Sequence, residues 1–206
     1  MIQGMESSLH LLIVGAGGVG GYFGGLVAAA GGATAAGGAT AAGGEVTYLA
    51  RGAHGEAIRA RGLVIRTGGK EIASRPGVVL PGEAIPPPGA VILAVKHRDL
   101  ASALAALGPA LRPGLPVLSL LNGIGHDKDI RLSLPGARVL LGTAFLGASI
   151  ESPGVILHTS EGRIAFGEAE GAPSDEARAI EKSLARGGFP VRLVDDVRPI
   201  LWRKLL

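Results

Sequence analysis

The sequence predicts an α/β fold, a doubly wound parallel sheet with an antiparallel extension. Through the first part of the chain, short apolar runs that suit strands buried on both faces alternate with segments of helical spacing. After Ala144 the pattern changes, and strand-like segments follow one another across pairs such as Pro153-Gly154, which is typical of antiparallel strands. The chain therefore combines a parallel core with a more local antiparallel part.

The alternating part begins with an apolar run that ends in glycine and continues with a helix of small apolar residues. Its strands are expected over residues 10–15, 45–50, 63–66, 78–80, 90–95, 117–121 and 139–141. Its helices are expected over residues 19–30, 53–61 and 100–111. This alternation of strand and helix is what predicts a doubly wound sheet.

The antiparallel part consists of short strands joined by turn-forming pairs. We expect strands over 144–150, 155–158 and 163–167, with Pro153-Gly154 and Glu161-Gly162 as the connections. Both pairs contain glycine, which accepts the backbone angles that tight turns require.

The last elements are helical with one further strand. An amphipathic helix is expected over 174–186, with Ser174 as its N-cap and Gly187-Gly188 after its end. A strand over 191–194 follows, and a helix begins at residue 198.

Residues 31–44 consist only of Gly, Ala and Thr, and a hexapeptide over 31–36 is repeated at once over 37–42. Such residues cannot bury large side chains, so they predict a flexible low-complexity insertion and not a solenoid. The whole stretch from Leu11 to Gly44 lacks Asp, Glu, Lys and Arg. Gly and Ala transfer poorly into lipid, and flanking positive charges are missing, so we expect no membrane anchor.

The composition excludes several classes of function. The 206 residues carry a net charge of +3 with scattered basic residues, which predicts no nucleic-acid binding. The absence of cysteine excludes disulfides, thiolate metal sites and cysteine catalysis, and fits a cytoplasmic location. The histidines show no metal-ligand spacing and no serine lies in a nucleophile elbow, so we expect neither a metal nor a serine hydrolase.

Residues 15–20, Gly-Ala-Gly-Gly-Val-Gly, form a GxGxxG motif directly after the first predicted strand and at the start of the first helix. In this context the first glycine permits a tight turn, the second lets the backbone approach a pyrophosphate, and the third lets helix and strand pack closely. The phosphates would lie on the unpaired N–H groups at the helix N-terminus. The motif predicts a Rossmann-type dinucleotide site, with a ligand-free glycine turn as the alternative.

Arg51 follows the second predicted strand, where dinucleotide-binding folds place the residue that contacts the adenosine ribose. It lies further from Gly20 than the usual spacing of about 20 residues, and removing the repeated hexapeptides restores that spacing. No acidic residue occupies this strand end, and an arginine suits a 2′-phosphate. Arg51 therefore favours NADPH, with a solvated loop arginine as the alternative.

Polar residues also follow two later strands, at the edge of the sheet where α/β folds bind ligands. Lys96 comes directly after the strand over 90–95, and Asn122 directly after the strand over 117–121. A lysine offers a cation to a carboxylate or phosphate, and an asparagine offers both a donor and an acceptor. Taken alone, Lys96 is as well explained by a surface position and Asn122 by a turn. Lys204, near the end of the chain, is by itself an ordinary solvated lysine.

Taken together and in this order, the motifs resemble the ketopantoate reductases (2-dehydropantoate 2-reductases). The matching segments are GAGGVGGYFGG at 15–25, LARG at 49–52, VILAVK at 91–96, LLNGIG at 120–125, GTAFLGA at 142–148, PGVILH at 153–158 and WRKLL at 202–206. Enzymes of this family transfer a hydride from NADPH to the 2-oxo group of ketopantoate. The product, pantoate, is used in pantothenate and coenzyme A synthesis.

The resemblance implies a role for each matching position. It implies cofactor-binding roles for Gly15, Ala16, Gly17, Gly18, Val19, Gly20, Arg51, Lys96, Asn122 and Ala148. It also places Asn122 on the nicotinamide and substrate side, and makes Lys204 the general acid that protonates the carbonyl oxygen as hydride arrives. A small-molecule 2-oxo acid is then the expected substrate.

The sequence departs from the family in two ways. The Gly/Ala/Thr repeat is not part of the family pattern, and the helical domain that follows the catalytic lysine in the family is essentially absent. We therefore expect residues 1–197 to form an NADP-binding domain, and residues 198–206 to be the first turns of a truncated C-terminal helical domain. Activity would then be impaired.

Two other functions remain open at the level of the sequence. One is a non-catalytic NADP(H)-binding module, and the other is a related reductase of another 2-oxo acid. A homodimer of the full-length form is also left open.

Overall fold

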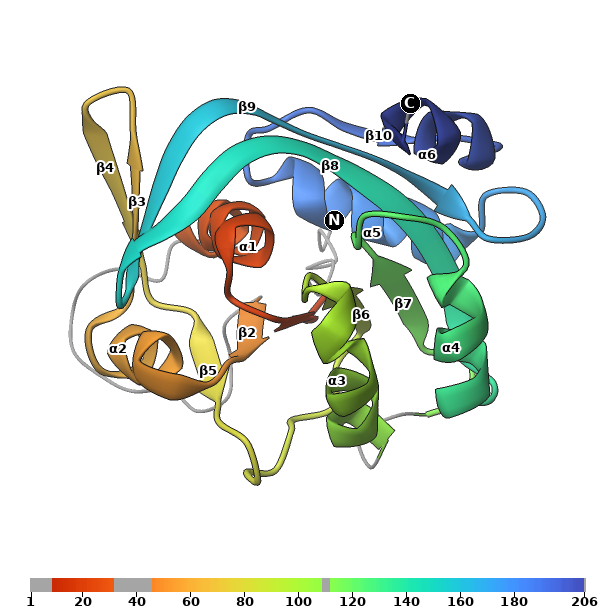
Figure 1. The fold of residues 1–206 in the computed structure, drawn as a ribbon, viewed down its shortest axis with the longest axis horizontal. Coiled ribbons are helices and arrows are strands. Elements are labelled where there is room, and N and C mark those ends of the chain that lie inside the picture. The colour runs from red at the N-terminus through yellow and green to blue at the C-terminus, as the bar shows by residue number, and fades with distance from the viewer. Residues whose placement is uncertain (1–8, 32–45, 109–111, 206) are drawn as a thin grey trace, which may run out of the picture.

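A computed structural model describes residues 9–31, 46–108 and 112–205. It has an α/β fold in which one curled sheet carries helices on its faces (Figure 1). Apart from Gly31, the insertion expected over residues 31–44 lies outside the described residues. Within the described ranges, none of the helices has the length and apolar character needed to cross a membrane.

The boundaries of the elements are as follows. The strands are β1 (Leu11–Val14), β2 (Val46–Leu49), β3 (Leu63–Thr67), β4 (Lys70–Ser74), β5 (Gly77–Val79), β6 (Ala90–Leu93), β7 (Pro116–Ser119), β8 (Arg138–Ser152), β9 (Val155–Glu168) and β10 (Val191–Leu193). The helices are α1 (Gly18–Ala30), α2 (Gly52–Arg61), η1 (His97–Asp99, a 3₁₀ turn), α3 (Leu100–Leu107), α4 (His126–Ser133), α5 (Asp175–Ala185) and α6 (Arg198–Leu205).

The parallel part of the sheet has the strand order β5-β2-β1-β6-β7-β8, and every neighbouring pair in it is parallel. The chain passes outward from β1 to β5 on one side, crosses back, and passes outward from β6 to β8 on the other. This is the strand order of Rossmann-type folds, in which ligands bind beyond the carboxyl ends of the strands where the order reverses. The predicted fold class is confirmed, and the reversal lies between β1 and β6.

The sheet continues past β8 and curls around α1. β8 and β9 form a long antiparallel hairpin that arches over this helix (Figure 1). β9 then pairs in parallel with β3, and β3 pairs with β4, so the first and last parts of the chain share one sheet. Glycines in α1 allow the close approach, since Gly21 lies against Ile156 of β9 and Gly25 against Leu63 of β3.

The antiparallel extension is confirmed, but two details of it were predicted wrongly. Pro153-Gly154 is the turn of the hairpin, as expected. Glu161-Gly162, in contrast, is not a turn, because β9 continues through it while pairing with β8 on both sides. The strands expected over 139–141 and 144–150 are likewise a single strand, β8.

Three elements were not predicted, namely the short 3₁₀ turn η1, the helix α4 and the strand β4. α4 is rich in charged residues, and its buried positions are only His126 and Ile130, so its apolar periodicity is too weak to see in the sequence. β4 lies at the edge of the sheet, where β3 is its one partner among the described strands, and it exposes most of its side chains. The other described elements match the expected ranges to within a few residues. Ser174 caps α5 as predicted, its Oγ accepting a hydrogen bond from the backbone N–H of Ala177 at 3.1 Å.

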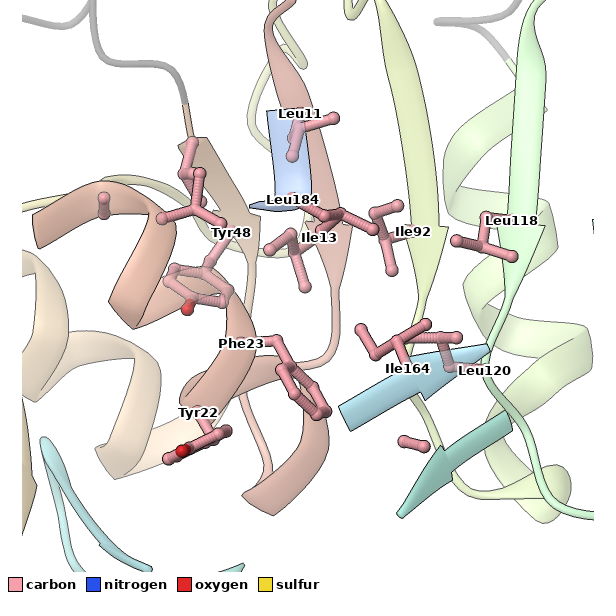
Figure 2. Packing of buried hydrophobic residues seen from close by; sticks show 14 of the residues in the cluster. Leu11, Ile13, Tyr22, Phe23, Tyr48, Ile92, Leu118, Leu120, Ile164 and Leu184 are labelled. Atoms are coloured by element: carbon pink, nitrogen blue, oxygen red, sulfur yellow. The ribbon is translucent and has the colours of Figure 1, made fainter. Parts of the chain in front are cut away.

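The sheet has an apolar core on each face, because successive strand residues point to opposite sides. On one face, Leu11 and Ile13 of β1 belong to a cluster with Phe23 of α1 and Leu184 of α5 (Figure 2). On the other face, Leu12 belongs to a second cluster with residues of α3 and α4. Each buried side chain of this size contributes about 1.5–3 kcal/mol to folding. β1 is therefore held from both sides, which fixes the turn that follows it.

Candidate functional site

A cleft of about 500 Å³ opens at the carboxyl ends of β1, β2 and β6. The glycine turn after β1, Arg51 after β2 and the segment between β6 and α3 line it. Ile150 of β8 adds an apolar wall from the hairpin. The cleft lies at the reversal of strand order, which is where a dinucleotide is expected to bind in this fold.

The glycine turn leaves one side open to the cleft. Gly15 has φ +98°, and its N–H donates to the carbonyl of Leu49 at 3.0 Å, which ties the turn to β2. Gly17 is the N-cap of α1, and a Cβ added to it would meet nothing within 4 Å. The backbone at Gly17 is therefore accessible, and the N-terminus of α1 carries no acidic side chain in its first turn that would repel an anion. These features fit a pyrophosphate.

The opposite side of the turn is closed by packing. A Cβ on Gly20 would collide with the carbonyl oxygen of Gly15, as the close helix–strand contact of the motif requires. A Cβ on Gly18 would collide with the carbonyl oxygen of Ala148 in β8. Val19 and Ala148 are partly buried and pack against the core. The backbone of Ala148 thus contacts the glycine turn, and Ala148 is not among the residues that line the cleft.

His54 is a site residue that the sequence did not reveal. Its Nε2 bonds to the carbonyl of Ala16 at 2.9 Å, and its Nδ1 accepts from the N–H of Gly154 at 3.1 Å. Since Nδ1 accepts, the ring is neutral and Nε2 is the donor. Burial lowers the pKa of His54 below its usual value, which also favours the neutral form. The histidine links the glycine turn to the tip of the β8–β9 hairpin, and only its position in the first turn of α2 hints at this.

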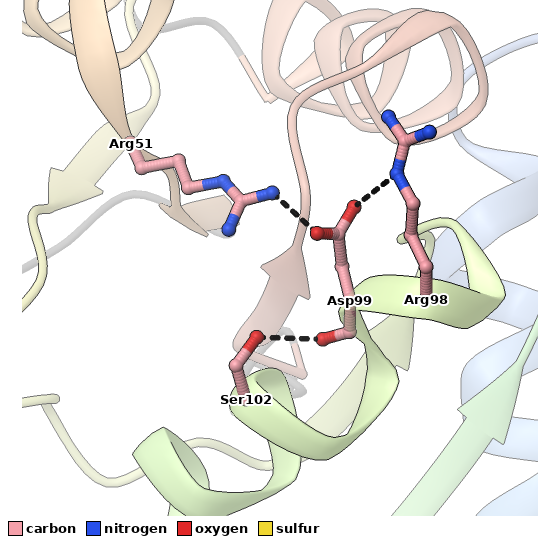
Figure 3. A network of polar contacts seen from close by, with 4 residues as sticks. All are labelled: Arg51, Arg98, Asp99 and Ser102. Carbon is pink, nitrogen blue, oxygen red and sulfur yellow. Dashed lines mark hydrogen bonds and ion pairs between the residues drawn. The ribbon is translucent and has the colours of Figure 1, made fainter.

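The rim of the cleft carries a cluster of charged side chains (Figure 3). Arg51 Nη2 donates to Asp99 Oδ1 at 2.7 Å, and Arg98 Nε lies 3.9 Å from Asp99 Oδ2. The hydrogen bond and charge of Arg51, with smaller contributions from Arg98 and Lys96, lower the pKa of Asp99 below its ordinary range. Arg51 thus lies where the sequence placed it, but with a carboxylate partner that the sequence did not suggest.

The structure separates two residues that the sequence placed on one ligand. Lys96 is exposed and lines the cleft just after β6. Asn122 is exposed in the loop after β7, before Gly123, and it is not among the residues that line the cleft. Both therefore follow strands of the same sheet edge, as expected, while only Lys96 borders the cavity.

Lys204 lies on α6, outside the cleft. Its Nζ donates to the carbonyl of Ala144 in β8 at 2.6 Å and lies 5.4 Å from the centre of the Phe145 ring. Burial lowers the pKa of Lys204 below its ordinary value, which makes its ammonium a stronger acid. Nothing in the described residues groups three or more histidine, aspartate or glutamate side chains as a metal site would need.

Comparison with known proteins gives a consistent result. Residues 11–171 match the family model described as ketopantoate reductase PanE/ApbA. The chain is 28% identical over 202 residues to the uncharacterized oxidoreductase YkpB of Bacillus subtilis, and 30% identical over 200 residues to a 2-dehydropantoate 2-reductase of Halobacterium salinarum. The fold is similar to the crystal structure of 2-dehydropantoate 2-reductase from Porphyromonas gingivalis, with a TM-score of 0.82 and 28% identity over 96% of this chain and 68% of that one.

The matches extend along almost all of this chain but not along all of its relatives. The alignments with the two curated relatives cover 96% of this chain, and 61% and 62% of their own lengths. The chain therefore spans about 60% of the curated relatives that it matches.

Proposed function

The chain belongs to the ketopantoate reductase (PanE/ApbA) family, and from this we propose that it reduces the 2-oxo group of 2-dehydropantoate to give pantoate, with NADPH as the reductant. The observation that carries the proposal is the open glycine turn at a cleft whose rim bears Arg51. We further propose that the reaction serves pantothenate and coenzyme A synthesis in the cytoplasm.

The residues of the cleft would hold the dinucleotide. The backbone of residues 15–20 would bind the pyrophosphate, since Gly17 leaves room for it and the N-terminus of α1 attracts negative charge. Arg51 would bind the 2′-phosphate at the end of β2, and Lys96 would add a second cation on the same rim. When bound, NADPH supplies the hydride.

Lys204 would supply the proton. A carbonyl that accepts hydride develops negative charge on its oxygen, and a nearby ammonium stabilises this charge and can transfer a proton to it. The carbonyl of Ala144 holds Nζ in place, and partial burial makes the ammonium a stronger acid than a solvated one. Asn122, in the loop after β7, would contact the substrate side.

The test separates binding from turnover in the 206-residue chain. We expect calorimetry to show NADPH binding, and NADPH oxidation to depend on added 2-dehydropantoate. In Lys204→Met, turnover should fall at least about a hundredfold while NADPH affinity stays within about twofold, as loss of a general acid requires. Lys70→Met, which removes an exposed lysine of β4, is the matched control.

Each outcome has a clear meaning. If the chain binds NADPH but turns over no 2-oxo acid, the proposal is wrong and the chain is a non-catalytic NADP(H)-binding module. Turnover with another 2-oxo acid in preference to 2-dehydropantoate would replace the substrate. Equal turnover in Lys204→Met and the parent chain would remove Lys204 from the mechanism.

A further inference from the structure

Asp99 occupies a helix N-cap without acting as one. It is the N-cap residue of α3, yet its side chain makes no capping hydrogen bond to that helix. Its backbone is helical (φ −99°, ψ −3°), because Asp99 also ends the 3₁₀ turn η1, whereas a capping aspartate has extended backbone angles. The carboxylate turns instead to Arg51, across the cleft, at 2.7 Å (Figure 3). The carboxylate is therefore held by the arginine and not by a capping bond to the helix.

The surroundings keep this carboxylate charged. Arg51, Arg98 and Lys96 all act on Asp99, and Arg51 acts most strongly. The side chain of Asp99 is 23% exposed, against 67% for Arg51, so the acid lies deeper in the rim than its partner. A ligand phosphate that approaches Arg51 must therefore approach a fixed negative charge as well.

We propose that Asp99 is a specificity-determining residue that competes with the 2′-phosphate for Arg51 and so narrows the preference for NADPH over NADH. The inference rests on the proposed function, in which Arg51 faces the adenosine ribose. A 2′-phosphate can form an ion pair with Arg51, but it also approaches the negative charge of Asp99. Repulsion between the two like charges weakens its binding. The 2′-hydroxyl of NADH meets no such repulsion and can donate a hydrogen bond to the carboxylate.

The test measures the dissociation constants of NADPH and NADH by calorimetry in the parent chain and in Asp99→Asn. The variant keeps the size of the side chain and removes its charge. We expect NADPH to bind about five- to tenfold tighter and NADH to bind equally or more weakly, since the change removes one repulsion and one acceptor. Glu71→Gln, which removes a carboxylate from an exposed ion pair with Arg66 in the β3–β4 hairpin, is the control for net charge and should leave both constants unchanged.

Two further variants make the cause specific. Asp99→Ser removes the charge with a smaller polar side chain, so it should also tighten NADPH binding relative to NADH binding. In an Arg51→Ala background, Asp99→Asn should change the preference for NADPH over NADH less, because competition for the arginine is gone.

The outcomes distinguish this inference from the proposed function. If the parent chain binds neither dinucleotide, the proposed function fails. Suppose instead that it binds both, and that the preference for NADPH, the dissociation constant of NADH divided by that of NADPH, is unchanged or falls in Asp99→Asn and Asp99→Ser. The inference is then overturned, and Asp99 serves only to hold Arg51 in place.

Discussion

At the scale of single residues, the site depends on polar side chains that contact residues far away in the sequence. His54 accepts from Gly154 and bonds to Ala16, so one imidazole holds the glycine turn and the hairpin tip at a fixed separation. Protonation would turn Nδ1 from an acceptor into a donor facing the N–H of Gly154. The bridge therefore requires the neutral ring.

The stability of the protein should accordingly depend on pH through His54. The folded protein holds the pKa of His54 below its ordinary value of 6.5, so it binds this proton less readily than the unfolded chain does. The contribution is fully present above pH 6.5 and is lost as the pH falls below it, towards the lowered pKa. Thermal unfolding as a function of pH measures this loss.

His54→Gln is the comparison, since glutamine can accept and donate but cannot take up a proton in this range. The difference in stability between parent and variant should shrink or reverse below pH 6.5. His126, whose pKa burial also lowers, contributes equally to both proteins and cancels. Parallel pH profiles would mean that His54 does not titrate with folding.

Residue types alone could locate some of these positions and not others. Gly15, Gly17 and Arg51 are placed correctly by the GxGxxG motif and by the end of the second strand, because local backbone geometry determines both. Asp99 and His54 were missed, because their partners lie far away in the sequence and no short motif records the pairing.

At the scale of elements, the contact between α1 and the β8–β9 hairpin is set by a glycine. Gly18 lies so close to the carbonyl of Ala148 that no side chain fits, whereas Gly17 faces open space. Gly18→Ala should therefore destabilise the fold by about 1–3 kcal/mol through overpacking. Gly17→Ala should change stability by less than about 0.5 kcal/mol, as expected for a position without neighbours.

Urea denaturation of the two variants measures this difference. The matched substitution at neighbouring positions isolates the contact with β8 from any general effect of replacing glycine. Equal destabilisation of both variants would show that the hairpin moves away from α1 without cost.

The hairpin itself shows why element boundaries were harder to predict than the elements. Glu161-Gly162 is a turn signal in the sequence, and Glu161 is the one non-glycine among the described residues with a positive φ. In the hairpin, Phe145 pairs with Arg163 and Leu146 pairs with Glu161. Gly162 is therefore left unpaired as a bulge, and β9 continues. The hydrogen bonds that β9 forms along most of the length of β8 therefore outweigh the local preference of Glu161-Gly162 for a turn.

At the scale of the whole molecule, ligand binding should stabilise the fold as one unit. A dinucleotide that binds only the folded chain adds about 2.7 kcal/mol at a concentration 100 times its dissociation constant. For a domain of this size, that corresponds to a rise in Tm of about 5–10 °C. Scanning calorimetry with saturating NADPH measures it.

Arg51→Ala provides the control for this prediction. The variant should lose most of the rise given by NADPH at a fixed concentration while keeping that given by NADH, because only NADPH carries the phosphate that Arg51 would bind. An equal rise in parent and variant would exclude Arg51 from the 2′-phosphate site.

The doubly wound arrangement of the parallel part was predicted from the sequence, whereas the curling of the sheet was not. Alternating strands and helices with a glycine turn after the first strand permit few topologies. The pairing of β9 with β3, however, joins distant segments through ordinary apolar residues such as Ile65 and Ile156, and nothing in their neighbourhoods specifies it.

That pairing has a consequence for how the chain assembles. α1 belongs to the first residues of the fold, yet the strands that enclose it are completed only when β9 reaches β3 (Figure 1). Contacts between segments so far apart carry a large loop-closure entropy and slow the folding of a chain. Until they form, the face of α1 that packs against β3 and β9 remains uncovered in the nascent protein, although this helix is among the first elements to be made.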